Sequence, residues 1–215
     1  MFKALMSVQW KWSKGAALLA TILGFAVPLG SVQSLQPEFM YSVSLVARMQ
    51  EFGIAYALLA AGVGLAFAVL AWSPDHKGRH VYALALPVNR SRYALMRFGA
   101  GALFLILPAI GVLAGCLVAI SIMHVPLGLH AYPFSLAFRF LLASGVSFSI
   151  FFAIAASTPR AAGTILGGLA SLLIVAFILS LTSVHFNVLG HASDFLFTEP
   201  GPLSVFTGRW MLIDA

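Results

Sequence analysis

Long uncharged apolar stretches alternate with polar ones along the chain, and this pattern predicts transmembrane helices. About 20 consecutive apolar residues are needed to cross a bilayer as a helix. The apolar residues are continuous and do not alternate with polar ones, which favours helices over the strands of a barrel. The stretches are Gly15–Val32, Phe52–Trp72, Gly99–Met123, Phe140–Ala156 and Ala161–Ser183. We therefore expect an all-α integral membrane protein, with a bundle of five transmembrane helices in a single domain over residues 1–215.

The two ends of the chain differ from these spans. Residues 1–14 form an amphipathic pattern, with Met1, Leu5, Val8 and Trp12 on one side and Lys3, Ser7, Lys11 and Lys14 on the other. This predicts an N-terminal helix in the membrane interface, or alternatively a short cytoplasmic start of the first span. Residues 184–215 contain no apolar stretch long enough to cross a membrane. They are therefore predicted to form an outer-face or re-entrant segment.

The polar segment Ser73–Phe98 contains five of the twelve Lys and Arg residues. Residues 80–86 favour a short helix with an apolar stripe, and Pro87 ends it because proline disfavours helix in the residue before it. Asn89 or Ser91 then caps the next helix. A rigid amphipathic helix between two spans is suited to docking onto a soluble partner. The alternative is a surface helix on lipid headgroups.

Composition and charge agree with a membrane protein and give it an orientation. The chain is 61% hydrophobic and 8% charged, whereas soluble domains are about 25% charged. With the N-terminus inside, inner segments hold nine Lys and Arg residues and outer segments three. The N-terminus and residues 73–98 are therefore expected to be cytoplasmic. The net charge of +6 then indicates contact with membrane lipids rather than with nucleic acid.

Residue patterns for catalysis are absent from the sequence. It has no G-x-x-x-x-G-K-[ST], G-x-S-x-G or H-E-x-x-H pattern. We expect a chain that is not an enzyme and has no cofactor or metal site of its own. The i,i+4 pair His76 and His80 lacks further metal ligands at a suitable spacing. Arg48 and Glu51 form an i,i+3 pair near an outer helix end, which predicts a rim pair or, alternatively, a gate.

One segment resembles a known family. Leu84–Arg97, LALPVNRSRYALMR, is similar to the "LPxxRxRyxxxR" segment between helices two and three in membrane subunits of type-2 ATP-binding cassette (ABC) exporters. The order of elements resembles that family over the whole chain, whereas the residue-level similarity covers about Val81–Arg97. The family pattern has six spans. The sixth is missing here, and RWMLIDA at residues 209–215 looks like the first turn of another helix, which favours a sequence that stops short.

The resemblance implies a permease subunit in a bacterial inner membrane that exports a hydrophobic or amphiphilic substrate. It would pair with a second permease subunit, as a homodimer or heterodimer, and each would engage a separate ATPase that binds ATP and Mg²⁺. A cytoplasmic coupling helix between helices two and three would fill a groove of that ATPase. Its expected contact residues are Val81, Tyr82, Leu84, Leu86, Pro87, Arg90 and Arg92. A structural or assembly subunit without transport is the alternative, and a lipid-modifying membrane enzyme is a third hypothesis.

Overall fold

The structure is a computed structural model that describes residues 2–33, 42–77, 89–122, 129–157, 163–164, 167–168, 171, 174–175, 195–198, 201, 203–207 and 210–214. Its helices are α1 (Phe2–Gln33), α2 (Ser42–Lys77), α4 (Arg90–Phe104), α5 (Ile106–Ile122) and α6 (Pro133–Ala156), and a 3₁₀ turn, η1, covers Ser204–Phe206. Two short strands, β1 (His130–Ala131) and β2 (Ile213–Asp214), pair with each other.

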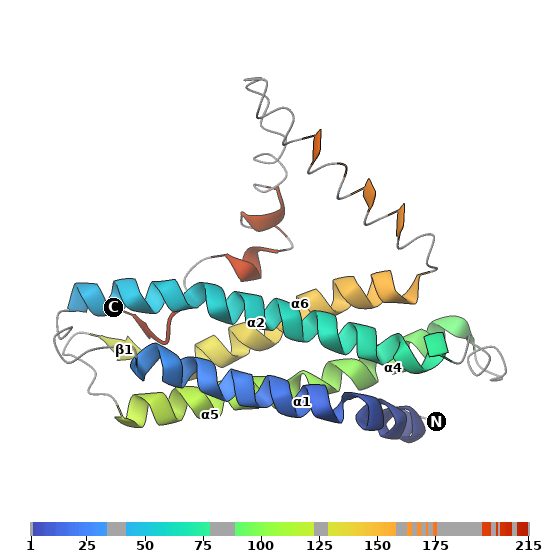
Figure 1. The fold of residues 1–215 in the computed structure, drawn as a ribbon, viewed down its shortest axis with the longest axis horizontal. Coiled ribbons are helices and arrows are strands. Elements are labelled where there is room, and N and C mark those ends of the chain that lie inside the picture. The colour runs from blue at the N-terminus through green and yellow to red at the C-terminus, as the bar shows by residue number, and fades with distance from the viewer. Residues whose placement is uncertain are drawn as a thin grey trace. The chain divides into compact units, whose positions relative to one another are not determined.

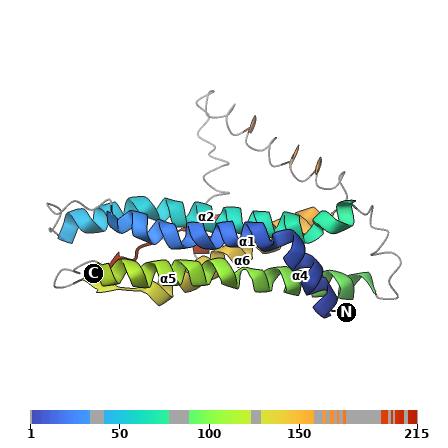
Figure 2. The same ribbon diagram turned by 60° about the horizontal axis from the view of Figure 1, so that its bottom comes forward.

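The long helices α1, α2, α4, α5 and α6 run side by side in both ribbon views (Figures 1 and 2). Successive spans run in opposite directions, as short connections require. Four of the described segments, Phe2–Val32, Phe52–Asp75, Arg90–Ile122 and Pro133–Ala156, are long and apolar enough to cross a membrane. This confirms the expectation of an α-helical, multi-pass membrane protein.

The chain divides into two compact units. One comprises Met1–Phe152 with Arg209–Ala215, and the other Ala153–Gly208. The fifth predicted span, Ala161–Ser183, falls in the second unit and lies mostly outside the described residues. Seven of its residues have helical backbone, including Gly167, Gly168 and Ser171. A span at this position stays a prediction.

Helix boundaries differ from the predicted ones for local reasons. The second span begins at Ser42 rather than at Phe52, and it continues through the first five residues of the polar segment to Lys77. Asn89 is the N-cap of α4, and its side chain accepts a hydrogen bond from the Ser91 amide at 3.4 Å. The predicted turn at residues 124–139 is shorter than expected, because α6 starts at Pro133, a position where proline's missing N–H costs nothing.

The third predicted span is two helices rather than one. A turn at Leu105 separates α4 from α5. Pro108 provides the physical reason, because it has no N–H for the carbonyl of Phe104 and its ring crowds that carbonyl. The residues of the third span before Leu105 therefore belong to α4, a distinct helix of 15 residues that already begins at Arg90 in the polar segment.

The N-terminal residues of α1 are continuous with the first span, and Figure 2 shows them turned relative to the rest of the helix. Gln9 and Ser13 are buried, whereas Val8 and Trp12, on the predicted apolar face, are about 40% exposed. Trp10 stacks on Phe104 of α4, with ring centroids 5.6 Å apart. This part of α1 thus packs against the protein with the face that carries Gln9 and Ser13. Its lysines are exposed.

Glycines set the distance between α1 and α5. A Cβ on Gly111 would lie 2.5 Å from the carbonyl oxygen of Thr21, and one on Gly115 would lie even closer to that of Phe25. The G-x-x-x-G spacing on α5 therefore forms a contact with α1, where small residues let backbones approach closely. Gly64 has the same role between α2 and α6, where Ser147 also donates a hydrogen bond to the Ala61 carbonyl at 2.8 Å.

Replacing Gly115 with alanine is expected to destabilise the bundle by about 1–3 kcal/mol, because the new methyl group meets a backbone carbonyl that cannot rotate away. The fraction of monodisperse protein after heating in detergent, measured by size-exclusion chromatography, would report the loss. Gly145→Ala is the matched control: it lies in α6 with nothing within 4 Å of its Cβ position. The control is expected to be neutral or to stabilise by up to about 1 kcal/mol through helix propensity. Equal effects of the two variants would contradict the α1–α5 contact.

Residues 210–214 are not helical, and the last two of them form the strand β2, so the prediction that RWMLIDA begins another helix is wrong for these residues. Ile213–Asp214 pairs antiparallel with His130–Ala131, and the Tyr132 amide donates to the Leu212 carbonyl at 2.8 Å. Trp210, Met211, Leu212 and Ile213 are all buried. The chain therefore packs its last described residues against the same end of the bundle where α6 begins.

Candidate functional site

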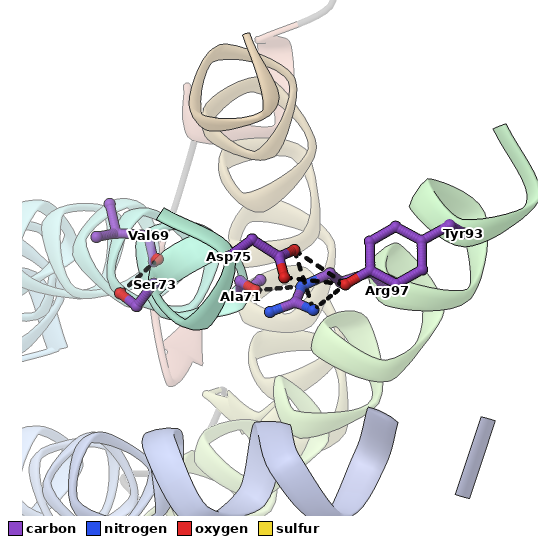
Figure 3. Close-up of polar contacts among 6 residues, drawn as sticks. All are labelled: Val69, Ala71, Ser73, Asp75, Tyr93 and Arg97. Atoms are coloured by element: carbon purple, nitrogen blue, oxygen red, sulfur yellow. Dashed lines mark hydrogen bonds and ion pairs between the residues drawn. The ribbon is translucent and has the colours of Figure 1, made fainter. Parts of the chain in front are cut away.

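A buried polar cluster joins α2 to α4 at the end of the bundle nearest the N-terminus (Figure 3). It consists of Asp75, Tyr93 and Arg97. The Arg97 Nη1 atom lies 3.1 Å from a carboxylate oxygen of Asp75 and donates to the Tyr93 hydroxyl oxygen at 2.6 Å. The Tyr93 hydroxyl in turn faces both Asp75 oxygens at 3.0 and 3.1 Å. We call these three residues the α2–α4 cluster.

The sequence places these side chains together by simple spacing. Tyr93 and Arg97 are four residues apart, on the same face of α4. Asp75 lies in the last turn of α2, directly after Pro74. Arg97 Nε also donates to the backbone carbonyl of Ala71, one turn before Asp75. The guanidinium thus holds the end of α2 by both a side chain and the main chain.

The cluster lies where two apolar runs meet polar sequence. Asp75 follows the uncharged run Phe52–Pro74, and Arg97 precedes the uncharged run Phe98–Met123. Charged side chains are costly in the middle of a bilayer but are tolerated near helix ends. We therefore place the cluster at the membrane boundary, on the two helices that flank residues 78–88.

Aromatic rings line the cluster on the side of the bundle. The Arg97 guanidinium carbon lies 5.7 Å from the ring centroid of Trp72, and Trp72 packs against Phe152 of α6 at 5.2 Å. Phe98 and Phe148 continue this group, with centroids 5.2 Å apart. The rings exclude water from one side of the ion pair and so strengthen its electrostatic attraction.

Burial makes the cluster energetically significant. The side chains of Asp75 and Arg97 are each only 5% exposed. A buried ion pair is costly to desolvate, and its members depend on each other for compensation. Among the described residues, Arg97 Nη2 and Trp72 Nε1 are also buried without a hydrogen-bond partner, and each such donor costs about 1–3 kcal/mol. The ion pair and hydrogen bonds of the α2–α4 cluster must therefore offset the cost of burying its charged and polar groups.

Two of the predicted coupling residues lie within the described residues. Arg90 and Arg92 are exposed on the first turn of α4, where they are accessible to a partner. The others, Val81, Tyr82, Leu84, Leu86 and Pro87, lie outside the described residues.

The predicted outer pair is placed only in part. Arg48 and Glu51 lie within α2, toward the end opposite the α2–α4 cluster, but their side chains lie outside the described residues. Their role as a rim or gate pair stays a prediction.

Asp75, Tyr93 and Arg97 as an interacting group were not predicted. The available signals were an acidic residue at the end of one apolar run and an aromatic–Arg pair at i,i+4 before the next. Both Tyr93 and Arg97 belong to the LPxxRxRyxxxR pattern, yet the pattern alone gives no partner for them. Within the described parts of the chain, no three His, Cys, Asp or Glu side chains are grouped so as to bind a metal ion.

Comparison with known proteins adds no assignment: no protein-family model, no curated protein and no solved structure matches this chain. The class defined by the fold is that of an α-helical, multi-pass membrane protein.

Proposed function

We propose that this chain is the membrane subunit of an ATP-driven exporter of the ABC type, located in a bacterial inner membrane with its N-terminus in the cytoplasm. ATP and Mg²⁺ would be bound by a separate ATPase subunit, and a second permease subunit would complete the transport path. The substrate would be hydrophobic or amphiphilic, because a bundle with few internal charges has little to offer a highly charged solute.

The observation that supports this proposal is the α2–α4 cluster. It ties together the two helices that lead into and out of residues 78–88, where the coupling helix is predicted. A displacement of that segment by a partner would reach α2 through Asp75 and α4 through Arg97 at the same time. Such a link is what an ATPase-driven permease needs, whereas a static assembly subunit does not need it.

The remaining contacts suggest which parts would move together. The cluster joins α4 to α2, Gly64 joins α2 to α6, and Gly111 and Gly115 join α5 to α1. The turn at Leu105 divides α4 from α5. In the proposed mechanism, α4 tilts with α2 about this turn while α5 stays packed on α1.

The proposal predicts that the chain, purified from membranes of its natural host, brings with it a protein containing a Walker A loop and ATPase activity. Leu84→Asp is expected to abolish this co-purification, because a carboxylate replaces an apolar side chain in the ATPase groove. The amount of chain in the membrane fraction should stay unchanged. The ratio of ATPase to permease subunit, measured by quantitative mass spectrometry, checks this result.

Leu84→Met is the matched control, since it keeps an apolar side chain of similar volume and should retain the ATPase. Retention of the ATPase by Leu84→Asp would contradict the assignment of the coupling helix. Co-purification of other membrane subunits alone, without an ATPase, would contradict transport and favour the structural or assembly subunit.

A further inference from the structure

The end of the bundle that carries the α2–α4 cluster has a strongly cationic surface. In the described parts of this end, Asp75 is the one acidic residue, and it is buried against Arg97. The exposed cations come from three helices: Lys3, Lys11 and Lys14 of α1, Lys77 of α2, and Arg90 and Arg92 of α4. We call this group the basic surface. Its charge is not balanced by any described carboxylate.

The geometry of α1 directs its three lysines away from the protein. The helix is seated by the face that carries Gln9 and Ser13. Lys3 and Lys14 are separated by about three helical turns and lie on one side, with Lys11 about a quarter turn away. All three are exposed. The lysines therefore form a stripe on the outward side of the helix.

Tryptophans mark the depth of this stripe. Trp10 and Trp12 are 43% and 40% exposed, and they flank the seated face of α1. The Lys77 ammonium lies 4.4 Å from the centroid of the Trp12 ring. Indole rings prefer the headgroup level of a bilayer. Further along α1, Leu18, Leu19 and Ile22 are about 60% exposed, as expected of residues that face lipid tails. The lysines thus lie beside the headgroup layer.

We propose that the basic surface binds the phosphate groups of anionic phospholipids. The cations match the charge of the phosphate headgroup, and the half-exposed indoles match the interface below it. The adjacent exposed leucines match the acyl tails. A folded acidic protein would match the charge but not the indoles or the adjoining apolar residues. The three lysines of α1 are not among the expected ATPase contacts, so a test on them does not depend on an ATPase partner.

The test is native mass spectrometry of the full chain in detergent, titrated separately with phosphatidylglycerol and phosphatidylcholine. Each basic residue near an anionic surface contributes about 1 kcal/mol, or about fivefold in affinity. Phosphatidylglycerol is therefore expected to bind at least about fivefold more tightly than phosphatidylcholine. In the variant K3Q/K11Q/K14Q this preference should weaken by at least about fivefold, because only Lys77, Arg90 and Arg92 of the basic surface remain, while binding of phosphatidylcholine is unchanged.

K3R/K11R/K14R keeps the charge and is expected to keep the preference, which separates a loss of charge from a loss of fold. Equal binding of the two lipids by the unmodified chain would overturn the proposal, as would an undiminished preference in the glutamine variant. Inorganic phosphate is not expected to displace the lipid, because it lacks acyl chains. Complete displacement would instead show a site for free phosphate and overturn the lipid assignment.

Discussion

Replacing Asp75 with alanine is expected to lower the free energy of unfolding by about 3–5 kcal/mol, because it leaves the Arg97 guanidinium buried without its countercharge. Tyr93 would lose its acceptor in the same change, since its hydroxyl faces both carboxylate oxygens. For a chain of this size the expected fall in melting temperature is roughly 6–20 °C.

The single cysteine offers a direct measurement of this effect. Cys116 is fully buried in α5, so a thiol-reactive fluorophore labels the chain only when the bundle opens. The melting temperature is the midpoint of labelling on heating in detergent. Ser73→Ala is a suitable control, because its hydroxyl donates to the Val69 carbonyl within the same helix, α2, rather than across to another helix. That variant should stay within about 0.5 kcal/mol of the unmodified chain.

The double variant Asp75→Ala with Arg97→Met separates the ion pair from its packing. Removing both charges eliminates the unpaired cation, and an apolar side chain fills part of the space beside Trp72. Replacement of a whole buried pair by apolar residues is often neutral or stabilising, so the double variant should recover most of the loss. Additive losses in the two single variants and the double variant would contradict an interaction between Asp75 and Arg97.

The hydrophobic pattern was sufficient to predict the membrane class and the position of the first four spans. Each span is a local feature, set by the length of an uncharged run and by the need to satisfy its backbone within a helix. The cap at Asn89 was also readable, since capping depends on a few neighbouring residues. The boundary between α4 and α5 was missed because proline can either kink or end a helix, and the surrounding packing decides which.

The candidate site was harder to predict from the sequence. Asp75 is 18 residues from Tyr93 and 22 from Arg97, and they meet only because α2 and α4 pack together. From the sequence, all the basic residues of Ser73–Phe98 served equally as markers of the cytoplasmic side. Only the packing separates Arg97, which is buried in an ion pair, from Arg90 and Arg92, which remain exposed. The same limit applied to α1, where the sequence showed an apolar face with Val8 and Trp12, yet Gln9 and Ser13 make the buried contact.

The packing of residues 210–214 leads to the second large prediction. The Trp210 ring is 3% exposed, and the Arg139 guanidinium carbon of α6 lies 5.0 Å from its centroid. On α2, a Cβ at Gly53 would lie 3.2 Å from the Trp210 Cβ. The tryptophan therefore fills space between two transmembrane helices, and the β1–β2 pair fixes the backbone that carries it.

Trp210→Ala is expected to destabilise the bundle by about 3–5 kcal/mol, the usual cost of removing a large buried aromatic side chain. Trp210→Phe should recover part of this loss, because a phenyl ring keeps some of the packing and a weaker attraction to the Arg139 cation. The control is Phe134→Ala: this ring begins α6 near the same strands but is 69% exposed, so its removal should cost little. Labelling of Cys116 on heating measures all three variants.

The effect of Trp210→Ala also decides between two structures for residues 209–215. If residues 209–215 instead formed the first turn of another helix, Trp210 would not be held between α2 and α6, and its truncation would leave the melting temperature as unchanged as that of Phe134→Ala.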